Sequence, residues 1–574
     1  RITVLAGGQA HPRDLNKHID HEACCDPVPA EDIELSVSQP LGMAITPDGE
    51  TLYVAVLGND KVVVYDTAEL ESDTHYPDPA DQIPVSGGGP TGVVLDPARD
   101  RLYVMTRFDN GISIIDTDAR EEIAHVTMHN PEPPSIVAGR RFLYDATISS
   151  RFGDQACSSC HVFGDKDDLS WDLGDPDGDV IAPPSNLRTA LLPNQFDLHP
   201  MKGPMSTQSL RGLANHGPMH WRADRNGDAN GPSVQPDGGA FSEEAAFMAF
   251  RQAFVDLLGR DEPLSVAQMQ AFTDFQLQVM YPPNPIRALD NSLTQDQQEG
   301  LEMFSNRIMF AMGPEFEQHT CRSCHVLDPN GNAEHGVPFP GFFGSDGQVV
   351  AGEFSQTFKI PHLRNLYTKI GAFGMAEDPI YNRPDLPTYD VSHKGDQIRG
   401  FGFHHDGGKD TPMRFFNVFA VANGFAPDGF VTHEEQRKVA EFLFAFDSNL
   451  KPIVGQQITL TASNGSVVGP RIDLLKARAD AGDCELIVKA GFFGVELGGF
   501  YIGNNKFTTN VSIAPPLTDT QIRQFVQLTT MPATYTCVPP GSGFRLGVDR
   551  DGDGYRDGDE LLLHSDPADP NDTP

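Results

Sequence analysis

Two short cysteine–histidine motifs hold the residues best suited to chemistry in this sequence. They are Cys157-Ser-Ser-Cys160-His161 and Cys321-Arg-Ser-Cys324-His325. The Cys-x-x-Cys-His pattern is the attachment signature of c-type haem, in which two thiols form thioethers to the porphyrin and the next histidine binds the iron. We therefore predict two covalently bound haem c groups with proximal ligands His161 and His325, rather than two redox or zinc half-sites.

A motif near the C-terminus has the spacing of an EF-hand calcium loop. The ligand positions of that loop correspond to Asp549, Asp551, Asp553, Tyr555, Asp557 and Glu560. Gly554 permits the sharp turn, and Tyr555 would supply its backbone carbonyl. We predict a structural calcium site that resembles the calcium repeats of dockerin or thrombospondin type 3; a solvated acidic tail is the alternative.

The overall composition limits the classes of partner. The chain has 574 residues, of which 39% are hydrophobic, as expected for a globular protein of several domains. Its 42 basic and 80 acidic residues give a formal net charge of −38, which argues against nucleic acid and anionic lipid and favours cations or basic proteins. No apolar run of about 20 residues predicts a transmembrane helix.

The other four cysteines fit an oxidising compartment. Cys484 and Cys537 flank a short β-rich stretch and are candidates for a disulfide bond. Cys24 and Cys25 are adjacent, so a vicinal disulfide, free thiols and bonds to another chain are all open. Together with haem c, these cysteines predict a periplasmic or extracellular protein whose chain has been exported and processed.

Residues 1–135 are predicted to be β-structure that precedes the first cysteine motif. Residues 40–67 and 90–117 align with each other, Tyr53 matches Tyr103, and short apolar strands end at Asp-Gly or Asn-Gly turns. This period predicts propeller blades, and the repeats resemble YVTN-type β-propellers. The opening RITVLAGG reads as the last strand of an earlier blade. Because two or three blades do not close a ring, missing upstream blades, an open partial propeller and completion by another chain all stay open.

Each cysteine motif is expected in a mainly α-helical domain. Helical spacing of apolar residues over 243–259 falls in the first domain, residues 136–290; a helix beginning after Thr294 and an amphipathic helix over 432–450 fall in the second, residues 291–455. The predicted fold is thus multidomain: propeller-like blades, two cytochrome c domains in tandem and a small β-rich C-terminal module. That module covers residues 456–540, and residues 541–574 form the calcium-binding tail.

Residues 136–455 resemble the bacterial di-haem cytochrome c peroxidases and their MauG-like relatives. The stretch GPMSTQSLRGLANHGPMHWRADR (203–225) resembles a family segment with a Phe-Trp-Asp-Gly-Arg signature. FKIPHLRNLYTKIGAFGM (358–375) and FGFHHDGG (401–408) resemble the Lys-Thr-Pro-x-Leu-Arg-Asn and Phe-His-Asp-Gly signatures of the second domain. The resemblance implies one electron-transfer haem and one haem that reacts with peroxide or dioxygen, with a small cytochrome or cupredoxin as electron donor.

The resemblance also suggests further iron ligands. In the family a methionine after the His-Asp-Gly segment binds the electron-transfer haem, but an ungapped match places Phe419 there. His404, His405, Met375 and Met413 are the candidate substitutes, and a histidine would give bis-His ligation.

At the first haem, the family's distal histidine corresponds to His199, displaced by one residue, with His216 and His220 as rivals. Trp221 falls where the family places a tryptophan between the haems, so it is a candidate for inter-haem electron transfer or for packing. Two other functions stay open: a pure electron-transfer di-haem cytochrome, favoured by the missing methionine, and a dioxygenase similar to the di-haem rubber oxygenases.

Overall fold

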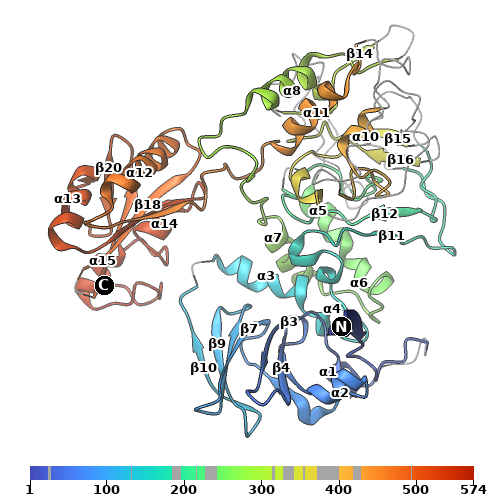
Figure 1. Ribbon diagram of the computed structural model, residues 1–574, viewed down its shortest axis with the longest axis horizontal. Coiled ribbons are helices and arrows are strands. Elements are labelled where there is room, and N and C mark those ends of the chain that lie inside the picture. Colours follow the sequence, from blue (N-terminus) through green and yellow to red (C-terminus); the bar gives the residue numbers. More distant parts are fainter. Residues whose placement is uncertain are drawn as a thin grey trace.

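The computed structural model has three parts that follow one another along the chain (Figure 1). Two N-terminal β-sheets lie at one end, mainly helical segments form the middle, and a mixed α/β unit contains the C-terminus. The structure describes residues 1–22, 28–130, 132–183, 196–214, 216–225, 242–312, 317–327, 342–352, 356–371, 400–417, 428–492 and 494–574. Within these ranges, no helix is long and apolar enough to cross a membrane.

The N-terminal part consists of two antiparallel four-stranded sheets that repeat each other. The first has the strand order β3 (Pro40–Ile45), β4 (Thr51–Val56), β5 (Lys61–Asp66) and β6 (Gln82–Pro84). The second has the order β7 (Pro90–Asp96), β8 (Arg101–Thr106), β9 (Gly111–Asp116) and β10 (Glu121–Thr127). Apolar residues of both sheets, including the fully buried Val62 and Leu102, form one shared cluster. The predicted repeat is confirmed, with Tyr53 in β4 and Tyr103 in β8.

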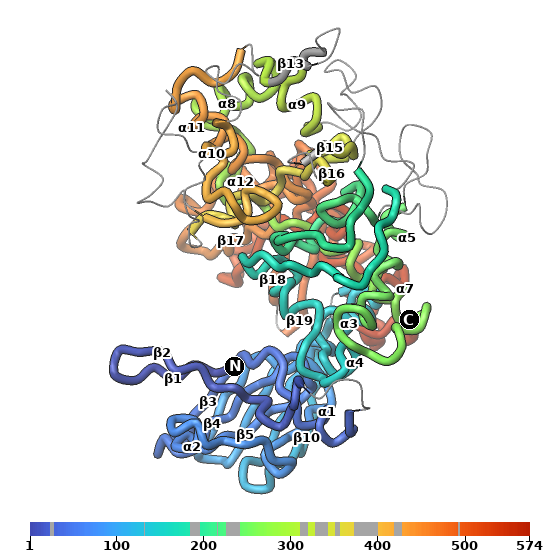
Figure 2. Tube along the Cα trace, turned by 90° about the vertical axis from the view of Figure 1, so that its right-hand side faces the viewer, coloured from blue at the N-terminus to red at the C-terminus, as the bar shows by residue number. Residues whose placement is uncertain are grey.

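The first residues of the chain do not belong to either sheet. β1 (Ile2–Ala6) pairs only with β2 (Gln9–Arg13) in a separate hairpin that projects beside the sheets (Figure 2). Gly7 and Gly8 both have positive φ, 58° and 76°, so the chain reverses at once and β1 finds its partner locally. The interpretation of this strand as the end of an earlier blade is therefore wrong.

The first helical region is held together by two helices that cross closely. α3 (Pro134–Tyr144) precedes the Cys157 motif, and α7 (Val266–Gln276) ends the region. Gly139 permits the crossing, because a Cβ at this position would clash with the Ala271 carbonyl oxygen. The helix predicted over 243–259 is broken into α5 (Glu243–Met248), a 3₁₀ turn (Ala249–Gln252) and α6 (Ala253–Asp256). The apolar period indicates the helical conformation but not this break.

The second helical region repeats this arrangement. α8 (Gln295–Asn306) and α11 (His433–Phe444) cross at Gly300, where a Cβ would clash with the Lys438 carbonyl oxygen. Both helices begin as predicted, with Thr294 and Thr432 accepting hydrogen bonds in capping boxes. The short elements of both helical regions are α4 (Ala146–Ser149), β11 (Ser170–Asp172), β12 (Pro204–Ser206), β13 (Phe310–Met312), β14 (Glu317–His319), α9 (Cys321–Cys324), β15 (Val349–Gly352), β16 (Gln356–Lys359) and α10 (Pro412–Phe416).

The C-terminal part is an α/β unit. Its six-stranded sheet has the order β17 (Gln457–Leu460), β22 (Ala533–Val538), β18 (Glu485–Phe492), β19 (Val495–Tyr501), β20 (Lys506–Thr509) and β21 (Leu517–Thr518). The disulfide Cys484–Cys537 is present, as predicted. Cys24 and Cys25 lie outside the described residues. The six-stranded sheet agrees with the predicted β-rich module, but the prediction did not include α12 (Gly465–Asp480) and α13 (Asp519–Thr529), which also pack on the sheet. The sequence does not predict α12, because this helix begins at a glycine and contains Pro470.

Candidate functional site

The first cysteine motif presents a histidine with one free ring nitrogen. Cys157–Ser159 form a 3₁₀ turn, and the His161 backbone N–H donates to the Cys157 carbonyl at 2.9 Å. His161 Nδ1 lies 2.8 Å from the Gln208 carbonyl oxygen, so Nδ1–H donates there and Nε2 is left without a proton. Burial lowers the pKa of His161, which keeps the ring neutral. This is the tautomer that a metal-binding imidazole requires.

The second cysteine motif repeats this geometry. The His325 backbone N–H donates to the Cys321 carbonyl at 2.9 Å, which closes the turn of α9. Its Nδ1 lies 3.0 Å from the Pro361 carbonyl oxygen and 3.4 Å from that of Gly344. Burial lowers the pKa of His325 to about 4. His325 is therefore also a neutral imidazole whose Nε2 is available to a metal.

The four motif cysteines suit covalent haem attachment better than a thiolate site. All four are free thiols. Burial raises the pKa of Cys157 and Cys321 to about 12 and also raises that of Cys160 and Cys324. Redox-active and zinc-binding Cys-x-x-Cys pairs function as thiolates, which this burial disfavours. A pair of thiols beside an imidazole with a free Nε2 is the donor set that haem c needs.

His220 forms an imidazole–carboxylate pair in the first region. Its Nδ1 lies 2.8 Å from Asp224 Oδ1, and its ring contacts Phe250 edge-on at 4.7 Å between centroids. Burial alone would raise the pKa of Asp224, but the charge and hydrogen bond of His220 lower it well below its usual range. His220 also lowers the pKa of His161 electrostatically, so the two imidazoles lie within range of each other. Because Nδ1 of His220 is bonded to the carboxylate, Nε2 is the ring nitrogen left for another partner.

The other two histidines predicted for the first site have different surroundings. His199 is exposed, and its Nδ1 accepts a hydrogen bond from the Met201 N–H at 3.1 Å. A neutral His199 therefore carries its proton on Nε2, the nitrogen that an iron ligand must keep free. His216 is buried, and its Nε2 lies 2.9 Å from Lys359 Nζ.

Trp221 lies where the two helical regions meet. Its indole N–H donates to the Ser206 carbonyl at 2.8 Å, and its own carbonyl accepts from the Lys359 N–H at 2.8 Å. Its ring contacts that of His405 edge-on, with centroids 6.4 Å apart. The tryptophan is thus held by backbone bonds to both regions.

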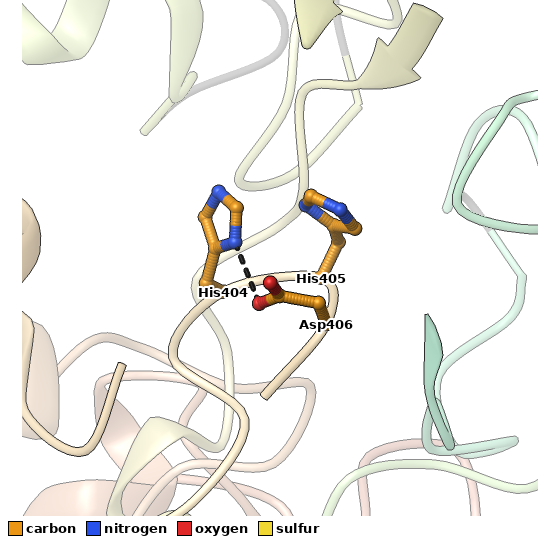
Figure 3. A group of neighbouring side chains, drawn as sticks. All are labelled: His404, His405 and Asp406. Atoms are coloured by element: carbon orange, nitrogen blue, oxygen red, sulfur yellow. Dashed lines mark hydrogen bonds and ion pairs between the residues drawn. The ribbon is translucent and has the colours of Figure 1, made fainter. Parts of the chain in front are cut away.

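The second imidazole–carboxylate pair is His404 with Asp406 (Figure 3). His404 Nδ1 lies 2.8 Å from Asp406 Oδ1, and one ligand atom from each of His404, His405 and Asp406 lies within 4.8 Å of the others. His405 stacks on Phe358 at 3.9 Å, and burial and the charge of His404 lower its pKa to about 4. The turn packs on the first region, because the Ser206 N–H donates to the His405 carbonyl at 2.6 Å.

Of the two candidate methionine ligands, Met413 lies within the described residues. Met413 in α10 is buried in the apolar cluster of the second region, with Phe304 and Phe416. Cys321 packs against the same cluster, and the Phe304 ring lies 6.4 Å from that of His325. Met413 is therefore a core residue on the side of the second motif. Met375 lies outside the described residues.

The sequence analysis did not identify a group of four basic residues, three of them buried, that the fold brings together from both helical regions. We call it the basic cluster; its members are His216, Lys359, His362 and Arg364. The sequence does contain an indication of this cluster, because three of its four residues occur in the seven-residue stretch FKIPHLR (358–364), among apolar residues that are buried. Buried basic residues without acidic neighbours in the sequence are uncommon.

The acidic loop near the C-terminus is folded as a turn with converging carboxylates. Asp549, Asp551 and Asp553 offer oxygens that lie within 4.8 Å of one another. Glu560 in α15 (Asp557–Leu563) is fully buried, and neither of its carboxylate oxygens has a hydrogen-bond partner. Burial and the neighbouring aspartates raise its pKa to about 7. The Asp557 carboxylate already has hydrogen-bond partners, because it accepts from the Arg550 backbone N–H at 2.7 Å and from Arg550 Nε at 3.0 Å. The unpaired, converging oxygens fit a hard cation such as calcium.

Comparison with known proteins identifies two segments of the chain. Residues 29–149 match the family of lactonases with a seven-bladed β-propeller, and residues 549–570 match the bacterial TSP3 repeat. A comparison with curated proteins found no match. The first match covers both N-terminal sheets, which are therefore propeller blades.

Solved structures are similar only at a distance. A hydrazine synthase chain from Kuenenia stuttgartiensis, pressurized with xenon, is 19% identical over 55% of this chain and 89% of its own length, with a TM-score of 0.34. Another hydrazine synthase chain from that organism is 29% identical over 16% of this chain and 24% of its own, with a TM-score of 0.14. The periplasmic gluconolactonase PpgL of Pseudomonas aeruginosa is 17% identical over 22% of this chain and 32% of its own, with a TM-score of 0.15. Beyond its propeller blades and TSP3 repeat, the chain is not assigned to a family by these similarities.

Proposed function

We propose that this protein is a di-haem c-type redox enzyme similar to the cytochrome c peroxidases and MauG. The observation that carries the proposal is the repeated motif geometry. Each Cys-x-x-Cys pair is followed by an imidazole, His161 or His325, whose Nδ1 donates to a backbone carbonyl. Cys157, Cys160, Cys321 and Cys324 would hold the two haems covalently. Haem iron, when bound, supplies one-electron transfer and reaction with peroxide or dioxygen.

The first site is proposed as the reactive one. His220 lies within electrostatic range of His161 and is oriented through Nδ1 by Asp224. An imidazole held by a carboxylate through Nδ1 can exchange a proton at Nε2 with a molecule that enters the site. His199 is exposed and has the opposite tautomer, so it is a poorer candidate for the same role.

Trp221 is proposed as the residue through which electrons pass between the two sites. It is bonded to backbone groups of both regions and contacts His405, which supports this position. The electron donor would be a small, basic cytochrome or cupredoxin, because the net charge of −38 attracts such a partner. Haem c and the Cys484–Cys537 disulfide are compatible with a periplasmic or extracellular location.

A second candidate function is electron transfer without catalysis. The observation that favours it is the second imidazole–carboxylate pair, His404–Asp406, with His405 beside it. If His220 and one of these histidines both bind iron, each haem has two strong axial ligands and no open position.

One experiment separates the two functions. Visible and EPR spectra of the oxidised and the half-reduced protein are recorded with and without hydrogen peroxide. The enzyme requires a high-spin signal in at least one state, together with consumption of peroxide. Low-spin signals from both haems in every state, without peroxide consumption, would contradict it. Absence of covalent haem would contradict both functions.

Calcium is proposed for the C-terminal loop, with carboxylates from Asp549, Asp551, Asp553 and Glu560 and the carbonyl of Tyr555. The two unpaired, buried oxygens of Glu560 support this assignment. Asp557 would instead position the loop through Arg550. The role is structural, because the loop belongs to the C-terminal unit: the Gly558 N–H of α15 donates to the Asn510 carbonyl of that unit.

A further inference from the structure

The basic cluster carries two buried cations without an ion-pair partner. Lys359 and Arg364 are 5% and 3% exposed, and neither forms a salt bridge with a carboxylate among the described residues. Among the described residues, the partners of the Lys359 ammonium are His216 Nε2 at 2.9 Å and the Pro218 carbonyl at 3.2 Å. Arg364 donates to the Gly212 carbonyl at 3.2 Å and to Asn449 Oδ1 at 3.3 Å. Burying a cation without an anion is costly, so this arrangement lacks a negative charge.

Several ring and guanidinium nitrogens in the same place have no hydrogen-bond partner. They are Arg364 Nε, His216 Nδ1 and His362 Nδ1. The His216 and His362 rings meet edge-on at 4.6 Å, and Tyr281 OH lies 3.1 Å from His362 Nε2. Buried polar atoms are nearly always paired in folded proteins, so unpaired nitrogens here point to a missing acceptor.

The neighbouring carboxylates do not supply that acceptor. Asp224 raises the pKa of Lys359 and Glu243 raises that of Arg364, but burial outweighs both and lowers the two pKa values, that of Lys359 to about 7. Asp224 is already bonded to His220, and Glu243 accepts from the His216 backbone N–H. Arg364 keeps its charge in any case, and a bound anion would favour the charged form of Lys359 and pair with both cations.

We propose that the basic cluster is a buried anion site that receives a propionate carboxylate of the haem attached to Cys321 and Cys324. The inference rests on the proposed function. Haem carries two carboxylates, and the cluster lies beside the second motif: Pro361, whose carbonyl holds His325, stands between Lys359 and His362 in the chain. Arg364 offers a planar donor set suited to a carboxylate, and Lys359 adds a point charge.

The site joins the two helical regions. Lys359, His362 and Arg364 come from the second region, whereas His216, the Gly212 carbonyl and Tyr281 come from the first. One propionate would thus be held by both regions at once. The cations next to it would favour the reduced, less positively charged iron and so raise the midpoint potential of the second haem.

The test is Arg364→Gln in the haem-loaded protein, with both midpoint potentials measured by spectroelectrochemical titration. We expect the potential of the second haem to fall, and that of the first to change less, while both haems stay attached, as judged by pyridine haemochrome absorbance. Arg364→Lys, which retains the charge, should restore most of the fall. Arg437→Gln in α11 removes an equal charge from the surface and is the control. If Arg364→Gln does not fold, the same potentials are measured in Lys359→Met.

Three results would be decisive. If Arg364→Gln and Lys359→Met each hold two haems, and their midpoint potentials change no more than those of Arg437→Gln, the proposal of an anion site is wrong. The di-haem assignment is then unaffected. If the wild-type protein carries no haem, the proposed function fails first. If acetate binds the wild-type protein in calorimetry and not Arg364→Gln, while the potentials are unchanged, the site belongs to a free carboxylate and the propionate assignment is overturned.

Discussion

The two cysteine-motif regions are alike in their scaffold and differ in what faces the motif. Each has a leading and a closing helix that cross at a glycine, Gly139 or Gly300, and each holds its histidine by Nδ1 to a backbone carbonyl. Among the described residues, a carboxylate-bound imidazole, His220, affects the pKa of the motif histidine in the first region, and none affects that of His325 in the second. In the second, Cys321 packs against an apolar cluster that contains Met413, and the Phe304 ring lies 6.4 Å from that of His325.

This difference indicates how one scaffold can serve two redox roles. The motif and the helix crossing determine where a haem would be attached, and they are nearly the same in both regions. In the proposed function, the residues near each motif would decide whether a proton acceptor or an apolar core lies beside the haem. In the proposed function, therefore, the first site does chemistry and the second transfers electrons.

The strongest test of the comparison removes one motif at a time. Cys157→Ala with Cys160→Ala should lose one covalent haem, and Cys321→Ala with Cys324→Ala should lose the other, because thioether bonds require the thiols. Haem content per chain should fall to about half in each double variant. Peroxide reactivity should disappear with the first pair and persist, at least for one turnover, with the second. Equal loss of reactivity in both variants would argue that the sites are not specialised.

Replacing His220 should affect the first haem site and leave the absorption spectrum of the second unchanged. In His220→Ala we expect peroxide turnover to fall by roughly 100-fold or more, as for loss of a positioned acid–base group. The second haem's absorption bands should not change. His199→Ala is the matched variant and should resemble the wild type, because His199 is exposed. A larger effect from His199 would reverse the assignment.

The shared scaffold is tested by adding a methyl group at each helix crossing. Gly139→Ala and Gly300→Ala should each lower the free energy of unfolding by about 1–3 kcal/mol, because the new Cβ has no room. Gly465→Ala in α12 makes only an ordinary contact with Leu460 and serves as the control. Urea unfolding followed by circular dichroism measures the change. A large effect at only one glycine would show that the two crossings differ in tightness.

Trp221→Phe tests the link between the regions. The phenylalanine keeps an aromatic ring but loses the N–H bond to Ser206 and raises the barrier to electron hopping. We expect inter-haem electron transfer to slow by roughly tenfold with both haems retained. Stopped-flow reduction monitored at the two haem absorption bands measures the rate. An unchanged rate would assign Trp221 to packing alone.

Calcium removal should leave both motif regions as they are. Chelation with EGTA is expected to destabilise the C-terminal unit by about 2–4 kcal/mol while the haem spectra stay constant. Glu560→Gln should abolish this calcium dependence, and Asp569→Asn in the exposed tail should not. Differential scanning calorimetry with and without calcium measures the change. If the haem spectra change on chelation, the loop influences the redox sites and the proposed separation is wrong.

Local patterns in the sequence predicted the elements whose signal is contained in adjacent residues. The two blades follow from short apolar strands that end at Asp-Gly or Asn-Gly turns. The helix after Thr294 follows from its capping residue, and the helix after Thr432 follows from apolar spacing. The Cys484–Cys537 disulfide was also predicted. The hairpin of β1 and β2 and the helices α12 and α13 were not predicted. The pairing of a strand, and the conformation of a segment without a clear apolar period, depend on what packs against them.

What the sequence by itself determined is the position of the two Cys-x-x-Cys-His motifs and of the acidic loop, because the haem and calcium chemistry proposed for them depends on residues that are neighbours in the chain. Only the tertiary structure decided how the histidines differ. His199, His216 and His220 are alike as residues, and the partner of each ring nitrogen distinguishes them. The basic cluster likewise exists only after two regions have folded together, since burial and a missing charge are properties of packing and not of spacing.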